Sequence, residues 1–254
     1  MDTADPDLIE ALGLHHGPGL ISIVGGGGKS SLLFALGEKL PGRVLLTTTT
    51  RIFAAQMGLA QRVFTLADSA WLEKAASDPG PALLVGHVEG ERAVGVPPAL
   101  AAEVLEQGRF DWVVIEADGS RMRPTKAPAE HEPVIPKQTQ HVIVVAGIDA
   151  LAGPIEEMAH RPERVSEITG LAREETLSPQ DLGRLLSSEQ GGLKDIPLAA
   201  EVSLLLNKVE TPKQEMDAEE TARNALKEKR VRRVLAGRLK PTPTASWKVW
   251  SQPT

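Results

Sequence analysis

The chain contains no cysteine and no tyrosine, and its aromatic residues are limited to four phenylalanines and four tryptophans. Without cysteine the chain has no disulfide, thiolate zinc site, iron–sulfur cluster or cysteine nucleophile. Such scarce aromatic side chains disfavour a base-stacking platform. Positive charge is not in excess, because the net charge is −6. That balance argues against nucleic acid as a partner and against polybasic binding to membranes.

Long apolar runs are missing as well, and none approaches the roughly 20 residues that cross a bilayer. The first ten residues are acidic and lack the apolar segment of a signal peptide. We therefore expect a cytoplasmic protein that does not bind membranes. Hydrophobic residues make up 41% and charged residues 24% of the 254 residues. These values suit a single soluble domain with a sizeable core, spanning residues 1–254.

Short apolar bursts alternate with segments of helical spacing along most of the chain. This alternation predicts an α/β fold with a mostly parallel sheet and helices on both faces. Strands are predicted at residues 20–24, 43–46, 63–66, 82–85, 93–96, 112–115, 141–146, 202–206 and 231–236. Helices are predicted at residues 30–40, 68–76, 97–106, 165–171, 178–186 and 214–230.

Two segments break the alternation. Residues 150–200 hold two predicted short helices and no strong strand, which indicates a helical excursion beside the sheet. Residues 245–254 form a polar tail that contains tryptophan.

The most informative segment is a glycine-rich loop between a predicted strand and a predicted helix. Gly25, Gly26, Gly27 and Gly28 precede Lys29, Ser30 and Ser31 in the run IVGGGGKSS. Glycines let backbone N–H groups curl around a phosphate, and the helix N-terminus adds partial positive charge. In such a loop the lysine reaches the β- and γ-phosphates and the serine hydroxyl binds Mg²⁺. The sequence thus predicts a P-loop nucleotide-binding fold that takes ATP or GTP with Mg²⁺.

The strict pattern G-x-x-x-x-G-K-[ST] is not met, because its first glycine falls on Ile23. The loop is therefore a short variant, similar to that of the amide ligases of cell-wall synthesis. A dinucleotide-binding fingerprint fits worse, since Ser30 occupies the place of its third glycine. The alternative is a plain glycine turn followed by an incidental Lys-Ser pair.

A second candidate lies at the end of the strongest predicted strand, where Glu116 and Asp118 precede Gly119. A P-loop enzyme needs a carboxylate at such a strand end to hold Mg²⁺, directly or through water. Glu116 and Asp118 are therefore the candidate metal ligands together with Ser30. The alternative is an ordinary strand end closed by an Asp-Gly turn.

A basic, proline-stiffened loop follows, with Arg121, Arg123 and Lys126 ahead of His131. Loops at the carboxyl ends of parallel strands carry ligands, so these cations are candidates for stabilising phosphate charge or an anionic second substrate. With Lys29 and Asp118 they make up the predicted catalytic set. A solvated charged loop is the alternative. None of the six histidines has metal-ligand spacing, and His131 and His160 are the two expected near a site.

Two further polar groups follow predicted strands. Thr49 and Thr50 belong to a run of four threonines, where hydroxyls would face the phosphates, although β-branched residues also simply suit a strand. Asn207, Lys208 and Glu210 form N-K-x-E, which resembles the N-K-x-D base-recognition element of GTPases. Glutamate in place of aspartate leaves the choice of purine open, and a strand followed by solvated charges is the alternative.

Six segments in this order carry a more specific resemblance: IVGGGGKSS, LLTTTTRIF, VVIEADGSRMRPTKAPAEHEPVIP, HRPE, LSPQDL and LLLNKVE. Over residues 18–210 they resemble the YqeC-like family, described as accessory proteins of selenium-dependent molybdenum hydroxylases or as selenium cofactor biosynthesis proteins. The resemblance implies a nucleotide-dependent role in making or inserting a selenium-containing molybdenum cofactor, with the hydroxylase or its cofactor as partner. Without cysteine, selenium would travel on a small molecule or another protein.

Three functions therefore compete. The first is a Mg²⁺-dependent nucleoside triphosphatase in cofactor maturation, in which hydrolysis drives a conformational change. The second is a P-loop small-molecule kinase or ligase that acts on an anionic substrate held by Arg121, Arg123 and Lys126. The third is a nucleotide-binding scaffold without catalysis. By analogy with nucleotide proteins that act as dimers across the phosphates, a homodimer is expected.

Overall fold

A computed structural model describes residues 7–14, 17, 19–239 and 247–252. The helices are α1 (Leu8–Leu12), α2 (Lys29–Lys39), α3 (Trp71–Ala76), α4 (Pro98–Glu106), α5 (Ile155–Met158), α6 (Pro162–Thr169), α7 (Pro179–Leu186) and α8 (Pro212–Ala225), with the 3-10 helices η1 (Ala54–Leu59) and η2 (Ile148–Leu151). The strands of the main sheet are β1 (Gly19–Gly25), β2 (Val44–Thr48), β4 (Val63–Thr65), β5 (Ala82–Val85), β8 (Trp112–Glu116), β10 (His141–Gly147), β12 (Glu201–Asn207), β13 (Val231–Ala236) and β14 (Lys248–Ser251).

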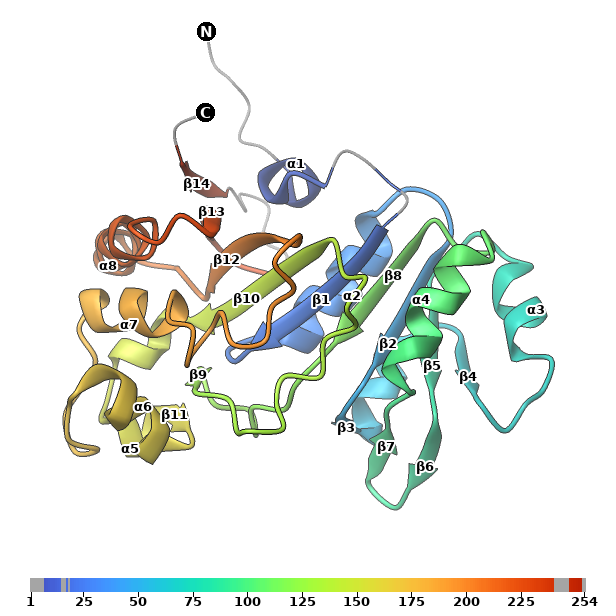
Figure 1. Cartoon of the computed structure of the whole chain (residues 1–254), viewed down its shortest axis with the longest axis horizontal. Coiled ribbons are helices and arrows are strands. Elements are labelled where there is room, and N and C mark those ends of the chain that lie inside the picture. The colour runs from blue at the N-terminus through green and yellow to red at the C-terminus, as the bar shows by residue number, and fades with distance from the viewer. Residues whose placement is uncertain (1–6, 15–16, 18, 240–246, 253–254) are drawn as a thin grey trace, which may run out of the picture.

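The nine-stranded sheet has the order β14-β13-β12-β10-β1-β8-β2-β5-β4 (Figure 1). All its neighbours pair in parallel except β13 and β14, which run antiparallel. The predicted α/β class with a mostly parallel sheet is therefore confirmed. From β1 the chain moves to β2 on one side and later returns to β10 on the other. Ligands of open parallel sheets bind where the strand order reverses in this way.

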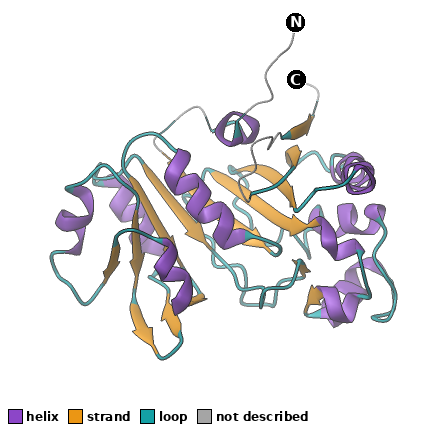
Figure 2. Cartoon of the chain, turned by 180° about the vertical axis from the view of Figure 1, so that it is seen from behind, coloured by secondary structure: helices purple, strands orange, loops and turns teal. Residues whose placement is uncertain are grey.

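Helices cover both faces of the sheet, as Figures 1 and 2 show from opposite sides. Alternate residues of β1 explain this arrangement, because Leu20 and Val24 join one apolar cluster while Ile21 and Ile23 join the other. The first cluster includes residues of α3, α4, α7 and α8, and the second includes residues of α1 and α2. The predicted placement of helices on both faces is confirmed.

Two small sheets lie beside the main one. The first contains β3 (Arg51–Phe53), β7 (Arg92–Val94) and β6 (His87–Glu89), all paired antiparallel. The second joins β9 (Thr125–Lys126) to β11 (Ala159–His160) in parallel. This second sheet fastens the start of the 150–200 segment, which contains α5, α6 and α7, to the loop that follows β8.

Several sequence predictions need correction. The strand predicted at 93–96 lies in the small antiparallel sheet rather than the main sheet. The helix predicted at 214–230 ends at Ala225. The residues between it and β13 form turns, in which the carbonyl oxygens of Asn224 and Ala225 accept backbone hydrogen bonds. The polar tail contains β14, whose pairing with β13 closes one edge of the sheet. Residues 245–246 and 253–254 of that tail lie outside the described residues.

We predict that Leu36→Ala lowers the free energy of unfolding by about 2–5 kcal/mol, because truncating a fully buried leucine leaves a cavity. Leu36 is 0% exposed in the cluster between α2 and the sheet. Urea unfolding followed by circular dichroism measures the change. Glu38→Ala, at an exposed position of the same helix, serves as the control and should change stability by less than about 0.5 kcal/mol. Equal effects of the two substitutions would contradict this packing.

Candidate functional site

The glycine-rich loop is packed closely against two other loops. Its N–H groups at Gly26 and Gly27 donate to the carbonyl oxygens of Val145 (2.8 Å) and Arg123 (3.0 Å). Gly27 has a φ of 68°, and a Cβ there would lie 2.0 Å from the amide nitrogen of Gly147. Glycine is therefore required at this position by both conformation and space.

The loop ends at the N-terminus of α2, where Gly28 is the N-cap and provides no side-chain hydrogen bond. The first N–H groups of a helix have no intrahelical partner, and they carry the positive end of the helix dipole. At Gly28 a Cβ would lie 2.3 Å from Nδ2 of Asn207. The N-terminus of α2 therefore receives no side-chain cap from its N-cap residue, and Asn207 packs closely against it.

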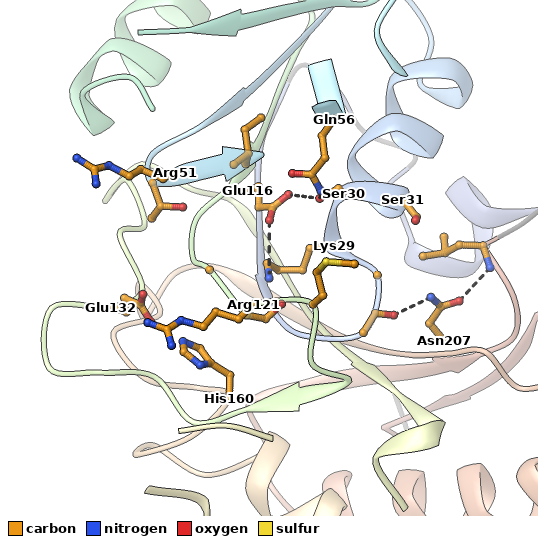
Figure 3. Close-up of a pocket in the computed structure, with 18 of the residues that line it drawn as sticks. Lys29, Ser30, Ser31, Arg51, Gln56, Glu116, Arg121, Glu132, His160 and Asn207 are labelled. Atoms are coloured by element: carbon orange, nitrogen blue, oxygen red, sulfur yellow. Dashed lines mark hydrogen bonds and ion pairs between the residues drawn. The ribbon is translucent and has the colours of Figure 1, made fainter. Parts of the chain in front are cut away.

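Glu116 meets Ser30 because β8 lies directly beside β1, with Ile23 opposite Glu116 in the register. The hydroxyl of Ser30 donates to Oε2 of Glu116 at 2.8 Å, and Nε2 of Gln56 donates to the same hydroxyl at 2.7 Å (Figure 3). Burial raises the pKa of the Glu116 carboxyl, while the nearby Lys29 charge and the Ser30 hydrogen bond oppose that shift. Ser30 and Glu116 therefore bring two side-chain oxygens together beside the N-terminus of α2.

Two buried lysines share one buried carboxylate behind this pair. Nζ of Lys29 donates to the carbonyl of Gly25 at 2.7 Å and lies 3.3 Å from Oδ1 of Asp118. Nζ of Lys126 lies 3.1 Å from Oδ2 of Asp118, which also accepts the N–H of Gly25 at 3.0 Å. All three side chains are at most 3% exposed, and buried charges of this kind require close partners of opposite charge.

Lys126 also connects to a second charged group. Its Nζ donates to Oε2 of Glu132 at 2.6 Å, and Nη1 of Arg161 donates to the same oxygen at 2.9 Å. Burial favours the neutral acid, but the hydrogen bonds and charges of Lys126 and Arg161 prevail and lower the pKa of Glu132 to about 2. The pKa of His160 falls to about 4, because burial and the charges of Arg161, Lys126 and Arg121 disfavour its protonated form.

The residues after β12 and β13 form the third part of the site. The side-chain amide of Asn207 donates to the carbonyl of Gly27 at 2.8 Å and accepts the N–H of Leu239 at 3.0 Å. Oδ2 of Asp149 accepts from Lys208 at 2.6 Å. Asn207 thus ties the glycine-rich loop to the loop that follows β13.

A further contact links the loops that follow β12 and β13. Nε of Arg238, which follows β13, lies 3.2 Å from Oε1 of Glu210, which follows β12. Both residues line the same cavity as Asn207.

These groups surround one cavity of about 720 Å³. Its size is within the range of small-molecule and cofactor sites. Seven lysines and arginines line it against three carboxylates, although the whole chain has a net charge of −6. The predicted site residues that line the cavity are Gly27, Gly28, Lys29, Ser30, Ser31, Thr50, Glu116, Arg121, Asn207, Lys208 and Glu210. Such a concentration of cations favours an anionic ligand.

Other predicted site residues do not line this cavity. Gly25, Gly26, Asp118 and Lys126 lie behind its surface, in the contacts described above. Thr49 donates its hydroxyl to the carbonyl of Val134 at 2.8 Å. Arg123 donates to the carbonyl of Glu157 and, like Thr49, is not among the lining residues.

The lining residues that were not predicted as site residues from the sequence include Gln56, Arg161 and Arg238. Arg238 directly follows a predicted parallel strand, so the rule that ligands bind at carboxyl ends of strands would have indicated it. Gln56 lies in η1, for which no sequence signal was found.

The sequence of this chain is similar to that of a known protein family. A family model described as "YqeC protein" matches residues 21–163, which is more than half of the chain. The chain is 39% identical over 201 residues to a protein of Escherichia coli (strain K12) named "Uncharacterized protein YqeC". That match covers 76% of this chain and 77% of the relative. The chain belongs to the YqeC family. The matched region of this YqeC-family protein includes the glycine-rich loop, Glu116 and the Arg161 segment.

Membrane and metal features are absent from the described part of this YqeC-family protein. No helix there is both long and apolar enough to span a bilayer. The same residues contain no cluster of three or more histidine, aspartate or glutamate side chains that would hold a metal ion.

We predict that Glu132→Gln destabilises the protein at pH 7 by about 1.5–3 kcal/mol, because Lys126 and Arg161 lose their charged partner. Since the folded pKa of Glu132 is lowered from 4.5 to about 2, its stabilising effect is full above pH 4.5 and is lost as the pH falls toward 2. The difference in free energy of unfolding between wild type and variant should therefore become smaller as the pH falls from 4.5 toward 2, as measured by urea unfolding. Glu130→Gln, at a 94% exposed side chain, is the control. A gap that stays constant with pH would contradict the assignment.

Proposed function

We propose that this YqeC-family protein is a P-loop nucleotide-binding protein that hydrolyses a nucleoside triphosphate with Mg²⁺. The observation that carries the proposal is the contact of Ser30 and Lys29 with Glu116 at the N-terminus of α2. A P-loop needs these three groups together: a lysine for the phosphates, a hydroxyl for the metal and a carboxylate at the neighbouring strand end. The excess of cations around the cavity supports a polyphosphate ligand.

Ser30 and Glu116 are the residues that would hold Mg²⁺. Mg²⁺ is typically bound through one or two protein oxygens, with water and substrate phosphates as the other ligands. The oxygen pair at 2.8 Å fits that donor set, and it needs no larger cluster of carboxylates. When bound, the ion would neutralise charge that develops on the phosphate oxygens. Asp118 remains a candidate ligand by sequence, but its bonds to Gly25 and to two lysines favour a positioning role.

Lys29 and the helix end would act directly on the nucleotide. The buried lysine ammonium donates to the Gly25 carbonyl and lies 3.3 Å from Oδ1 of Asp118. Preorganised donors of this kind need little rearrangement as charge builds in the transition state. Arg121 is the lining cation of the basic loop that would add charge near the terminal phosphate.

The Asn207 segment would hold the nucleoside. Asn207 bridges the phosphate loop and Leu239, while Glu210 and Arg238 offer an acceptor and a donor at the same end of the cavity. This pair would read the polar edge of a purine.

The role in selenium-containing molybdenum cofactor maturation or insertion rests on the resemblance to the YqeC-like family. A cytoplasmic location and a hydroxylase as partner belong to the same proposal.

We expect Lys29→Ala to weaken binding of Mg·ATP or Mg·GTP at least tenfold in calorimetric titration, because one charged phosphate contact is removed. Phosphate release by the wild type should be lost in the same variant. Lys39→Ala, at the exposed far end of α2, is the matched control and should bind normally. If neither nucleotide binds to the wild type at millimolar concentration, the proposal is wrong. Binding without phosphate release would instead identify a non-catalytic scaffold.

A separate experiment addresses the base. With ADP and GDP, Glu210→Ala should bring the ratio of the two affinities about tenfold closer to one, since a lost charged hydrogen bond affects only the preferred base. Glu219→Ala, on the exposed side of α8 and outside the cavity lining, should leave the ratio unchanged. An unchanged ratio in Glu210→Ala would show that Glu210 does not read the base.

A further inference from the structure

A second charged group lies across the cavity from Lys29 and Ser30. It consists of Arg121, His131, Glu132, His160 and Arg161, which we call the arginine end, and all five line the cavity. Figure 3 shows Arg121 pointing toward Glu132 and His160, on the opposite side of Lys29 from Ser30. Apart from Arg121, the members of this group have no role in the proposed hydrolysis of a nucleotide at the α2 end.

Secondary structure fixes the arginine end in place. The parallel pairing of β9 with β11 sets His160 opposite Lys126, although the two residues are far apart in the sequence. Glu132 is only 8% exposed and joins Lys126 to Arg161 through one oxygen. The positions of these residues are therefore fixed by the fold, unlike those of mobile charged side chains on the surface.

Its positive charge exceeds what its own carboxylate can neutralise. Glu132 is already hydrogen-bonded to Lys126 and Arg161. Arg121 makes no hydrogen bond or ion pair with any described residue, and its side chain is exposed. The imidazole of His160 is neutral at pH 7, because its pKa lies at about 4 in this cationic surrounding. A guanidinium without a protein partner is therefore available for an anion.

The backbone is strained at the same place. Arg121 and Arg161 have φ values of 48° and 64°, in the left-handed region that non-glycine residues rarely adopt. Five non-glycine residues in the described chain have positive φ, and Asp195 alone among them does not line the cavity. Such conformations cost energy and gather at ligand sites, where the surrounding structure enforces them.

We infer that the arginine end is a second oxyanion subsite, which holds the carboxylate or phosphate group of a co-substrate facing the terminal phosphate of the nucleotide. Guanidinium groups bind both oxyanions in bidentate fashion, so the chemistry at the subsite is shared by the two ligands. The inference rests on the proposed function only for what occupies the other end of the cavity. Arg121 and Arg161 contact the anion, and Glu132 acts as a positioning residue for Arg161.

The test titrates inorganic phosphate, and in a second arm malonate, into protein saturated with Mg·ADP or Mg·GDP. We expect at least one anion to bind, and Arg121→Asn to weaken that binding about tenfold. Asparagine tolerates the left-handed conformation, and the Arg121 side chain makes no hydrogen bond or ion pair with the residues that the structure describes, so the variant should fold normally. Arg164→Ala is the matched control, because this neighbouring arginine donates to the Pro128 carbonyl and does not line the cavity.

The same titrations with Lys29→Ala separate the two ends. Binding that survives Lys29→Ala but falls in Arg121→Asn supports the second subsite, even if no nucleotide binds and the proposed function fails. Binding that is lost in Lys29→Ala and unchanged in Arg121→Asn would place the anion at the α2 end and overturn the inference. Absence of binding by either anion at millimolar concentration would overturn it as well. The relative affinity for phosphate and malonate identifies the anionic group of the co-substrate.

Discussion

Asp118 is the buried carboxylate on which the two ends of the site depend. It accepts the Gly25 N–H, and it lies within 3.3 Å of the ammonium groups of Lys29 and Lys126. Each lysine then reaches a different partner, the glycine-rich loop for Lys29 and Glu132 for Lys126. Removing a single charge from such a buried chain leaves the others unpaired, which is strongly destabilising. The positions of the glycine-rich loop and of the arginine end therefore depend on each other.

Much of the fold was predictable because its strands are short, apolar and buried on both faces. The strand at 112–115 and the helix at 30–40 correspond to β8 and α2, since their patterns depend on local periodicity alone. Pairing partners were harder to predict. The strand at 93–96 has the same composition as a core strand, yet β7 pairs with β3 and β6 outside the main sheet. The local sequence of a strand does not determine which sheet it joins or which strands it pairs with.

The candidate site likewise has features that could be predicted from the sequence and features that could not. The glycine-rich loop and Glu116 were recognisable because their chemistry follows strand ends, and parallel strands bring such ends together. The difference between Asp118 and Glu116 was not recognisable, since both follow one strand and both are carboxylates. Burial separates them: Glu116 lines the cavity beside Ser30, whereas Asp118 is enclosed by lysines. Thr49 was predicted to face the phosphates, but its hydroxyl donates to the Val134 carbonyl and it is not among the residues that line the cavity.

The cavity concentrates features that reduce stability in the absence of a ligand. Cations outnumber carboxylates among its lining residues, and four of the non-glycine lining residues have left-handed backbone conformations. Like charges held close together repel, and strained backbone adds to that cost. An anion that binds the folded state relieves the repulsion and stabilises the protein through mass action. The chain as a whole is acidic, with a net charge of −6, so this cationic cavity contrasts with its surroundings. The excess of positive charge is therefore a property of the cavity itself and does not reflect the overall charge of the chain.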